Sequence, residues 1–229
     1  MAIDREGLDA PARLDYDIFE FVLRHRIEAA RFKPWRMPFV SSNGFFNNIA
    51  ITLTQARRND AADVETYLAR IRALPGYFDR QIENMRMGID AGFTMPRETM
   101  DGVLGVVGAQ VVGSAYEHPL WAPFEDLPAS LSDEEKRAYR ARGRQAIADL
   151  AMPAYERVHR FFRDEYLPAA RDTIAATDLP DGRAYYRYLL RFNTTLDDVS
   201  PDAIHETGLA EVARIRRQHV ESASASLPA

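Results

Sequence analysis

The sequence predicts an all-α protein, an irregular array of several helices rather than a simple bundle. The clearest helical signal is an apolar stripe in which Phe78, Ile82, Met85 and Ile89 recur at steps of four, three and four residues, as on one face of an α-helix. No stretch shows sustained alternation of apolar and polar residues, and no hairpin turn lies between β-branched runs. Prolines, glycines and capping residues divide the remaining chain into further helices.

Four helices are expected in the first part of the chain. A polar N-terminal extension over residues 1–13 precedes the first helix, and a loop over residues 33–44 follows it. Gly92 comes directly after the apolar stripe, where a residue with left-handed backbone commonly ends a helix. The predicted helices cover residues 15–32, a stretch from about residue 46, residues 63–73 and about residues 75–91.

A proline-rich stretch separates these helices from the second part of the chain. Three prolines between residues 117 and 128 argue against regular structure there, and Trp121 and Phe124 are expected to anchor the loop to the core. Ser132 and Glu135 then fit a capping box, in which each side chain accepts a hydrogen bond from the other residue's backbone N–H. A long helix is therefore predicted to begin at Ser132.

This long helix is expected to be interrupted near Pro153 and again near Pro168, because proline lacks the N–H that a helix interior needs. Another helix is predicted after the turn at residues 180–182. A last helix opens with the dipeptide Ser-Pro at residues 200–201, with serine as the cap and proline in the first turn. Its predicted core face consists of Ile204, Val212 and Ile215.

One helical domain is expected over residues 14–220, followed by a disordered tail over residues 221–229. The chain has 229 residues, of which 46% are hydrophobic, so that a sizeable core can be buried. The tail reads ESASASLPA, which is mostly small and polar and has no periodic pattern.

Charge and cysteine content narrow the classes of partner and chemistry. The formal net charge is −5, and no basic surplus marks one segment, so a nucleic-acid partner is not expected. The sequence contains no cysteine, which excludes disulfides, zinc sites with cysteine ligands and thiol catalysis.

No membrane span is expected, and the predicted location is cytoplasmic by default. The N-terminal residues 1–11 are polar and lack the apolar segment of a signal peptide. The longest apolar run without charge covers residues 102–116, which is shorter than the roughly 20 residues that a spanning helix needs.

The dipeptide His205-Glu206 is the first half of a zinc-peptidase helix motif. Such a motif needs a second histidine four residues after the first, but position 209 is leucine. His219 is 14 residues away, or about 21 Å along a helix, too far for one zinc ion that is bound at about 2.1 Å. We therefore expect no metal ligand and no catalytic residue here.

Two other pairs of titratable residues are expected to be structural. Glu156 and His159 have the Glu-x-x-His spacing of di-iron bundles, but the chain contains no second pair of this kind. His159 lies on an apolar stripe, where a hydrogen-bonded core histidine is the commoner outcome. His25 and Glu28 are expected to form a pair on a helix surface.

The segment YYRYLLRFNTT, residues 185–195, carries the candidate binding residues. Three phenols lie within four positions and point in several directions at helical spacing, so some of them face a partner or a cavity. Packing is one interpretation, because buried tyrosines also need hydroxyl partners. The other is contact with a substrate, with candidates Tyr185, Tyr186, Arg191 and Asn193.

Five segments follow one another along the chain: LDYDIFEFVLRHRIEAARF, GFTMPRETMDGVL, HPLWAPFEDLP, PAYERVHRFFRDEYLPAAR and LPDGRAYYRYLLRFNTTLDDVSPDAIHETGLAEVARI. The last segment is the most specific: it has a Pro-Asp-Gly turn, paired tyrosines, Thr-Thr and then Ser-Pro-x-x-Ile-His-x-x-Gly-Leu. In the order of these segments the chain resembles, over roughly residues 14–217, the bacterial family called domain of unknown function 885.

The resemblance implies part of a larger helical fold similar to zinc metallopeptidases, whose zinc motif lies in a later region that nothing here matches. We expect a helical partial domain without catalytic activity of its own and without a cofactor, zinc being implied only for full-length relatives. A peptide is the implied substrate in the full-length context, and self-association through exposed apolar surface is expected. The alternative is a non-catalytic helical binding or interaction module; no nucleophile–base pair supports a metal-free enzyme.

Overall fold

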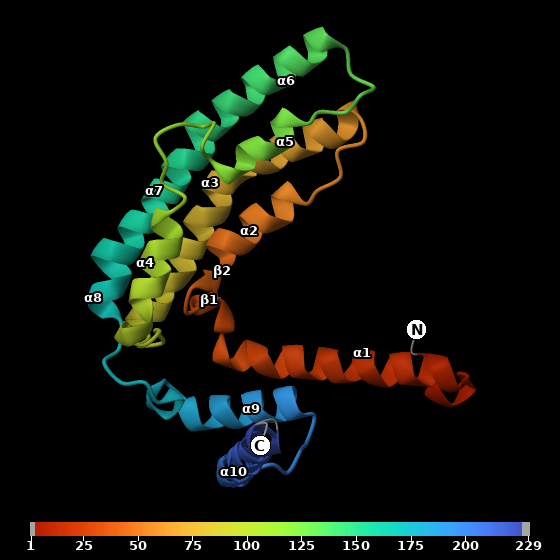
Figure 1. The fold of residues 1–229 in the computed structure, drawn as a ribbon, viewed down its shortest axis with the longest axis vertical. Helices are drawn as coiled ribbons and strands as arrows, with labels where there is room; N and C mark the ends of the chain where they lie inside the picture. Colours follow the sequence, from red (N-terminus) through yellow and green to blue (C-terminus); the bar gives the residue numbers. More distant parts are fainter. Residues whose placement is uncertain (1–2, 226–229) are drawn as a thin grey trace. The chain divides into compact units, whose positions relative to one another are not determined.

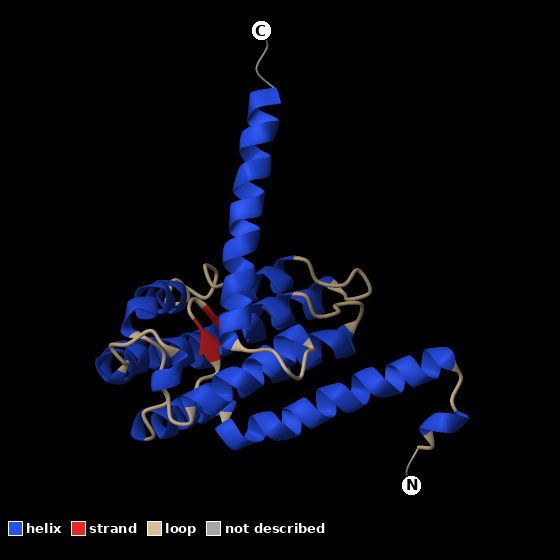
Figure 2. Cartoon of the chain, turned by 90° about the horizontal axis from the view of Figure 1, so that it is seen from below, coloured by secondary structure: helices blue, strands red, loops and turns tan. Residues whose placement is uncertain are grey.

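The computed structural model describes residues 3–225 and confirms the all-α prediction (Figures 1 and 2). Within this range, the named strands are a two-residue pair, β1 (Phe39–Val40) and β2 (Asn43–Gly44), which run antiparallel with Phe39 opposite Gly44. In the same range, no helix is both long enough and apolar enough to cross a membrane.

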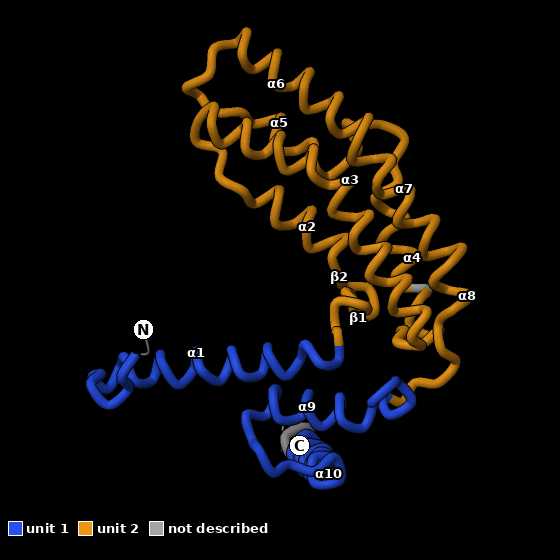
Figure 3. Tube along the Cα trace, turned by 180° about the vertical axis from the view of Figure 1, so that it is seen from behind, with its two compact units in different colours: residues 1–32, 176–229 blue, residues 33–175 orange. Residues whose placement is uncertain are grey.

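The chain divides into two compact units, which Figure 3 distinguishes by colour. Unit 1 combines residues 1–32 with residues 176–229, and unit 2 is continuous over residues 33–175. The helices of unit 1 are α1 (Ala10–Ala29), α9 (Gly182–Thr194) and α10 (Pro201–Ala225). Those of unit 2 are α2 (Phe45–Thr54), α3 (Ala61–Asp90), α4 (Met100–Gly108), α5 (Ala122–Glu125), α6 (Asp133–Ala146), α7 (Met152–Phe161) and α8 (Leu167–Ala169). The predicted domain over residues 14–220 stays a prediction, because contact density alone does not define a folding unit.

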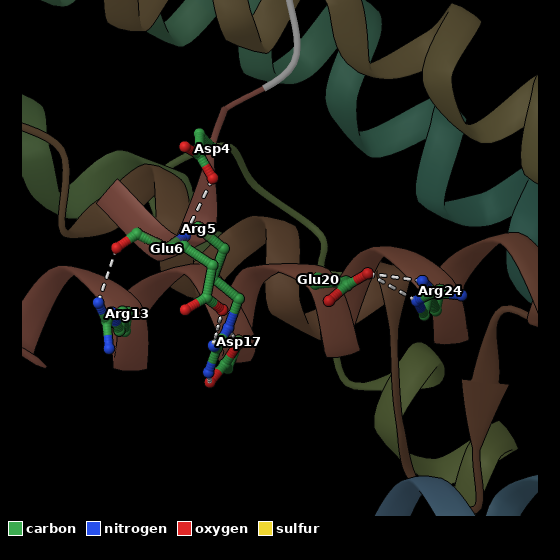
Figure 4. A network of polar contacts seen from close by, with 7 residues as sticks. All are labelled: Asp4, Arg5, Glu6, Arg13, Asp17, Glu20 and Arg24. Carbon is green, nitrogen blue, oxygen red and sulfur yellow. Dashed lines mark hydrogen bonds and ion pairs between the residues drawn. The ribbon is translucent and has the colours of Figure 1, made fainter. Parts of the chain in front are cut away.

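The polar N-terminal segment is folded back on α1 rather than extended (Figure 4). Arg5 lies in a short 3₁₀ turn and donates two hydrogen bonds of 2.6 Å to the carboxylate of Asp17. Asp9 caps α1 by accepting the N–H of Ala12 at 2.9 Å, so the helix begins at Ala10, earlier than the predicted residue 15. The paired carboxylate and guanidinium are both partly exposed, so solvent screens their attraction and limits what the pair adds to stability.

The two helices predicted over residues 63–73 and 75–91 are one 30-residue helix, α3, with Pro75 inside it. Its buried side, which includes Leu68, Ile71 and Phe78, is continuous across the proline. Tertiary packing of this side outweighs the helix-breaking tendency of Pro75. Gly92, with φ of +68°, then follows the end of the helix as predicted.

The capping box at Ser132 and Glu135 is confirmed, and the helix it opens is interrupted where the prolines predicted. Each interruption is a π-helical turn: residues 147–151 before Pro153 and residues 162–166 before Pro168. The residue before each proline, Met152 or Leu167, donates its N–H five positions back instead of four.

The loop at residues 117–128 is more regular than predicted, because it contains a 3₁₀ turn (Pro119–Trp121) that leads into α5. The proline at position 123 lies in the first turn of α5, where its missing N–H costs nothing. Trp121 and Phe124 are buried in the core of unit 2, as expected for anchors of the loop.

Aromatic rings from distant parts of unit 2 form the centre of its core. Phe39 of β1 packs edge-on against Phe162 and Tyr166, with ring centroids 5.1 and 5.2 Å apart. The buried hydroxyls of two of these tyrosines have backbone partners: Tyr155 donates to the carbonyl of Phe46 at 3.0 Å, and Tyr166 accepts the N–H of Met95 at 3.0 Å. These bonds satisfy the polar ends of rings that are otherwise dehydrated.

The predicted core face of the last helix is exposed in the structure. Ile204, Val212 and Ile215 lie on one side of α10, and 37%, 48% and 44% of their surfaces are accessible to solvent. The prediction of the helix was right, but the prediction that this side is buried was wrong. Residues 221–225 continue α10, whereas residues 226–229 of the predicted tail lie outside the described residues.

Candidate functional site

Helix α9 carries all four predicted binding residues, and its two ends are set by unusual backbone. Asp181 before the helix and Thr195 after it both have left-handed conformations, with φ of 56° and 59°. Gly182 is buried against the preceding turn, where a Cβ would lie 2.2 Å from the carbonyl oxygen of Ala176. The Pro-Asp-Gly turn therefore needs its glycine for close approach of the backbone.

One face of α9 packs against α1 in an aromatic cluster within unit 1. His25 of α1 lies between Tyr188 and Phe192, with ring centroids 5.9 and 5.5 Å away. Tyr185 packs on Phe32, with centroids 5.1 Å apart. Burial raises the pKa values of Tyr185 and Tyr188, so both phenols stay neutral. Tyr185 is therefore half-buried and packs within this cluster, and its contact with a substrate stays a prediction.

Arg191 is held in an ion pair on the flank of this cluster. Its guanidinium donates to a carboxylate oxygen of Glu28, and 31% of each side chain is exposed. The predicted surface pair of His25 with Glu28 is thus wrong: His25 is buried among aromatic rings, and Glu28 serves Arg191. The packing of α1 against α9, which no local pattern shows, decides both partners.

The opposite face of α9 is open to solvent and carries the other two predicted residues. Tyr186 is 36% exposed, and Asn193, seven residues later on the same face, is also exposed. The Asn193 side-chain amide donates to the carbonyl of Leu189 in its own helix at 2.8 Å. Tyr186 also lines a cavity.

This cavity measures about 150 Å³ and combines an aromatic ring with cationic side chains. Arg183 and Arg187 flank Tyr186 at spacings of three and one residues, and Thr177 and Pro201 complete the lining. Within the described residues neither arginine has an ion pair, so both can receive an anionic group such as a carboxylate. Sequence reasoning missed these arginines, although their helical spacing around Tyr186 was a usable signal.

The other candidates from the sequence do not converge on a metal site. His205 and Glu206 are exposed on α10, Glu156 is exposed on α7, and His159 is half-buried beside Gly108. Among the described residues, no group of three or more histidine, aspartate or glutamate side chains could hold a metal ion. The residues present in this part of the chain therefore do not fit zinc, and we place no metal chemistry on them.

A buried histidine that sequence reasoning missed lies in unit 2. His118 caps the 3₁₀ turn before α5 by accepting the N–H of Leu120 on Nδ1 at 3.2 Å. Its ring is 1% exposed and lies 5.2 Å from the ring of Tyr155, and Nε2 has no hydrogen-bond partner among the described residues. Burial lowers the pKa of His118 to about 4, so the imidazole is neutral.

Comparison with known proteins identifies relatives of the chain. Residues 1–227 match the family described as "Bacterial protein of unknown function (DUF885)", in agreement with the family expected from the sequence. The fold is similar to the crystal structure of a "putative lipoprotein" from Colwellia psychrerythraea, with a TM-score of 0.71 and 24% identity. The match covers 78% of this chain but 31% of that protein, so the chain spans about a third of the relative's length. Comparison with curated proteins gives no match.

Proposed function

The chain belongs to the bacterial family of unknown function DUF885, and on that premise we propose that it is a helical partial domain of a zinc-dependent metallopeptidase-like protein. In this proposal the chain supplies a scaffold and a peptide-contacting surface but no catalytic activity of its own. The resemblance read from the sequence supports the peptidase class. The chain's coverage of 31% of its solved relative supports a partial domain.

The observation that carries the proposal is the exposed apolar side of α10. An amphipathic helix in a globular protein normally buries such a stripe against neighbouring elements. Ile204, Val212 and Ile215 are instead accessible, and Leu209 is 60% exposed on the same helix. In the proposed arrangement, further helices of a longer protein cover this stripe. In isolation the same stripe favours self-association.

The solvent-facing side of α9 is the proposed peptide-contacting surface. Tyr186 offers a ring for stacking and a hydroxyl for hydrogen bonding, and Arg183 and Arg187 can bind a carboxylate of the peptide. Asn193 lies on the same face of the helix and extends the polar surface by about two turns. Tyr185 and Arg191 support this surface from the packed side.

Two measurements on two proteins test the proposal. The longer Colwellia relative is expected to contain zinc by elemental analysis and to hydrolyse peptides. Replacing its counterpart of Tyr186 with alanine is expected to raise KM more than it lowers kcat. The 229-residue chain is expected to contain no stoichiometric zinc and to show no turnover. A zinc-free relative without peptidase activity, or stoichiometric zinc in the shorter chain, contradicts the proposal.

A non-catalytic helical binding or interaction module is the second candidate function. The cavity beside Tyr186 favours it, because a surface that binds an anionic group needs no catalytic partner. An independent module is expected to be a monomer or a defined oligomer that does not bind a hydrophobic dye. A partial domain with an uncovered stripe is expected to bind the dye and to associate. Size-exclusion chromatography with light scattering separates the two.

We keep the cytoplasmic location as part of the proposal, and fractionation of cells that express the native gene tests it. Neither nucleic acid nor a membrane is proposed as a partner.

A further inference from the structure

An apolar groove lies in unit 2, between α2 and α3. It measures about 400 Å³ and is lined by Ile49 and Leu53 from α2 and by Ala73, Leu74 and Tyr77 from α3. Helices α2 and α3 pack side by side in this region (Figure 1). The space is large enough for one or two aliphatic side chains of a partner.

Two arginines line this groove, and neither forms an ion pair within the part of the chain that the structure describes. Arg70 and Arg80 line the same cavity, are exposed, and form no hydrogen bond or ion pair with another described residue. Asp79 is next to Arg80 in the sequence, but it pairs with Arg157 at 3.1 Å. The remaining lining residues are uncharged, so the groove combines an apolar floor with two positive charges.

The two arginines bracket the apolar residues along one face of α3. They are ten residues apart, which is about 15 Å along the helix axis, and Ala73, Leu74 and Tyr77 lie between them on the same side. A complementary partner therefore needs two negative charges about 15 Å apart with apolar side chains between them. An α-helix with acidic residues ten positions apart has this pattern.

We propose that the α2–α3 groove binds an acidic amphipathic helix of a partner protein. Apolar side chains of that helix enter the groove, and its two carboxylates pair with Arg70 and Arg80. The charged groove between α3 and α7 differs, because Arg86 pairs with Glu165 and Arg157 pairs with Asp79 across it. In the α2–α3 groove, Arg70 and Arg80 form no ion pair with a described residue, so both are available to carboxylates of a partner.

The test uses a fluorescein-labelled helical peptide of about 18 residues with two glutamates ten positions apart and leucines on the same face between them. Fluorescence anisotropy measures its binding to the 229-residue chain at low and high salt. The double variant R70E/R80E is expected to weaken binding at least tenfold, and high salt is expected to weaken binding to the unmodified chain. Ala73→Glu, at an exposed position in the groove, is expected to do the same by placing a carboxylate on the apolar floor.

The matched control is R216E/R217E, which makes the same change in net charge at exposed positions on α10. This variant is expected to bind the peptide within twofold of the unmodified chain. Circular dichroism and the thermal midpoint establish that each variant is folded. A peptide with lysines in place of the glutamates is expected not to bind.

Three results overturn the proposal. The first is an equal loss of peptide binding in R70E/R80E and R216E/R217E. Binding then depends on the net charge of the chain and not on the groove. The second is that the chain binds phosphatidylserine vesicles but not the peptide, and that R70E/R80E abolishes the vesicle binding. The groove then binds an anionic membrane surface. The third is a dimer of the chain that R70E/R80E dissociates, since the occupant is then a second copy.

Discussion

Lowering the pH is expected to destabilise the protein through His118. This imidazole is buried and neutral, and its Nδ1 accepts the N–H of Leu120. Protonation places a charge in a dry environment and removes the lone pair that accepts this hydrogen bond. The unfolded chain carries no such restriction, so His118 takes up a proton there near its ordinary pKa of 6.5.

The size and sign of the effect follow from the two pKa values. The folded-state pKa of about 4 lies about 2.5 pH units below 6.5, and about 1.4 kcal/mol per unit gives about 3 kcal/mol in total. Between these pH values the unfolded state binds the extra proton. The stability contributed by neutral His118 is therefore complete above pH 6.5 and is lost as the pH falls toward 4, with about 2 kcal/mol lost by pH 5.

The assay is urea unfolding of the unmodified chain and of His118→Asn at several pH values between 5 and 7.5. Asparagine keeps an acceptor for the cap of the 3₁₀ turn but does not titrate. The variant is expected to be less stable at pH 7.5 and to lose about 2 kcal/mol less than the unmodified chain by pH 5. Exposed His205→Asn, which removes a histidine outside unit 2, is the control. Parallel stability curves for His118→Asn and the unmodified chain refute the reasoning, as does an NMR titration of folded His118 with a midpoint near 6.5.

Three further substitutions test the packing. Gly143→Ala places a Cβ 2.5 Å from the ring of Phe124 and is expected to cost about 1–3 kcal/mol in urea unfolding. Gly208→Ala, on α10 with nothing within 4 Å, is expected to raise the helix content and to stabilise by about 0.5–1 kcal/mol; a loss of helicity contradicts its open surroundings. Tyr166→Phe leaves the buried N–H of Met95 without its acceptor and is expected to lower the free energy of unfolding by about 1–3 kcal/mol; an unchanged value contradicts the hydrogen bond.

The sequence predicted those features whose cause lies within a few residues of chain. Ser132 and Glu135 cap each other at a separation of three residues, and both hydrogen bonds are present. Gly92 takes the left-handed conformation that glycine reaches most easily. The apolar stripe of α3 was predictable from the spacing of its residues, because that spacing follows from the geometry of a helix. In each case a local pattern has one dominant structural outcome.

The candidate site depended on contacts that no local pattern contains. Tyr185 and Tyr186 are adjacent, yet one packs in the aromatic cluster and the other is exposed, because successive residues point about 100° apart around a helix. Which of them faces inward is decided by α1. The ion pair that fixes Arg191 joins residues 163 positions apart in the chain. The sequence predicts this segment as a candidate binding segment, but it does not show which face of the helix packs and which is exposed.

Prolines show how long-range packing changes the meaning of a local signal. All three prolines, Pro75, Pro153 and Pro168, lack the N–H for a helical hydrogen bond, so each one predicts a break in its helix. Before Pro153 and Pro168, the chain adds a residue to the turn, so the preceding N–H bonds five positions back and the ring gains room. The α3 helix continues through Pro75 without such a turn, with Ile71, Leu74 and Phe78 buried on either side of it. A wider turn at Pro75 rotates every later residue by about 100° around the helix axis. The second half of the buried stripe then leaves the core. Burial of the whole stripe therefore favours the regular helix.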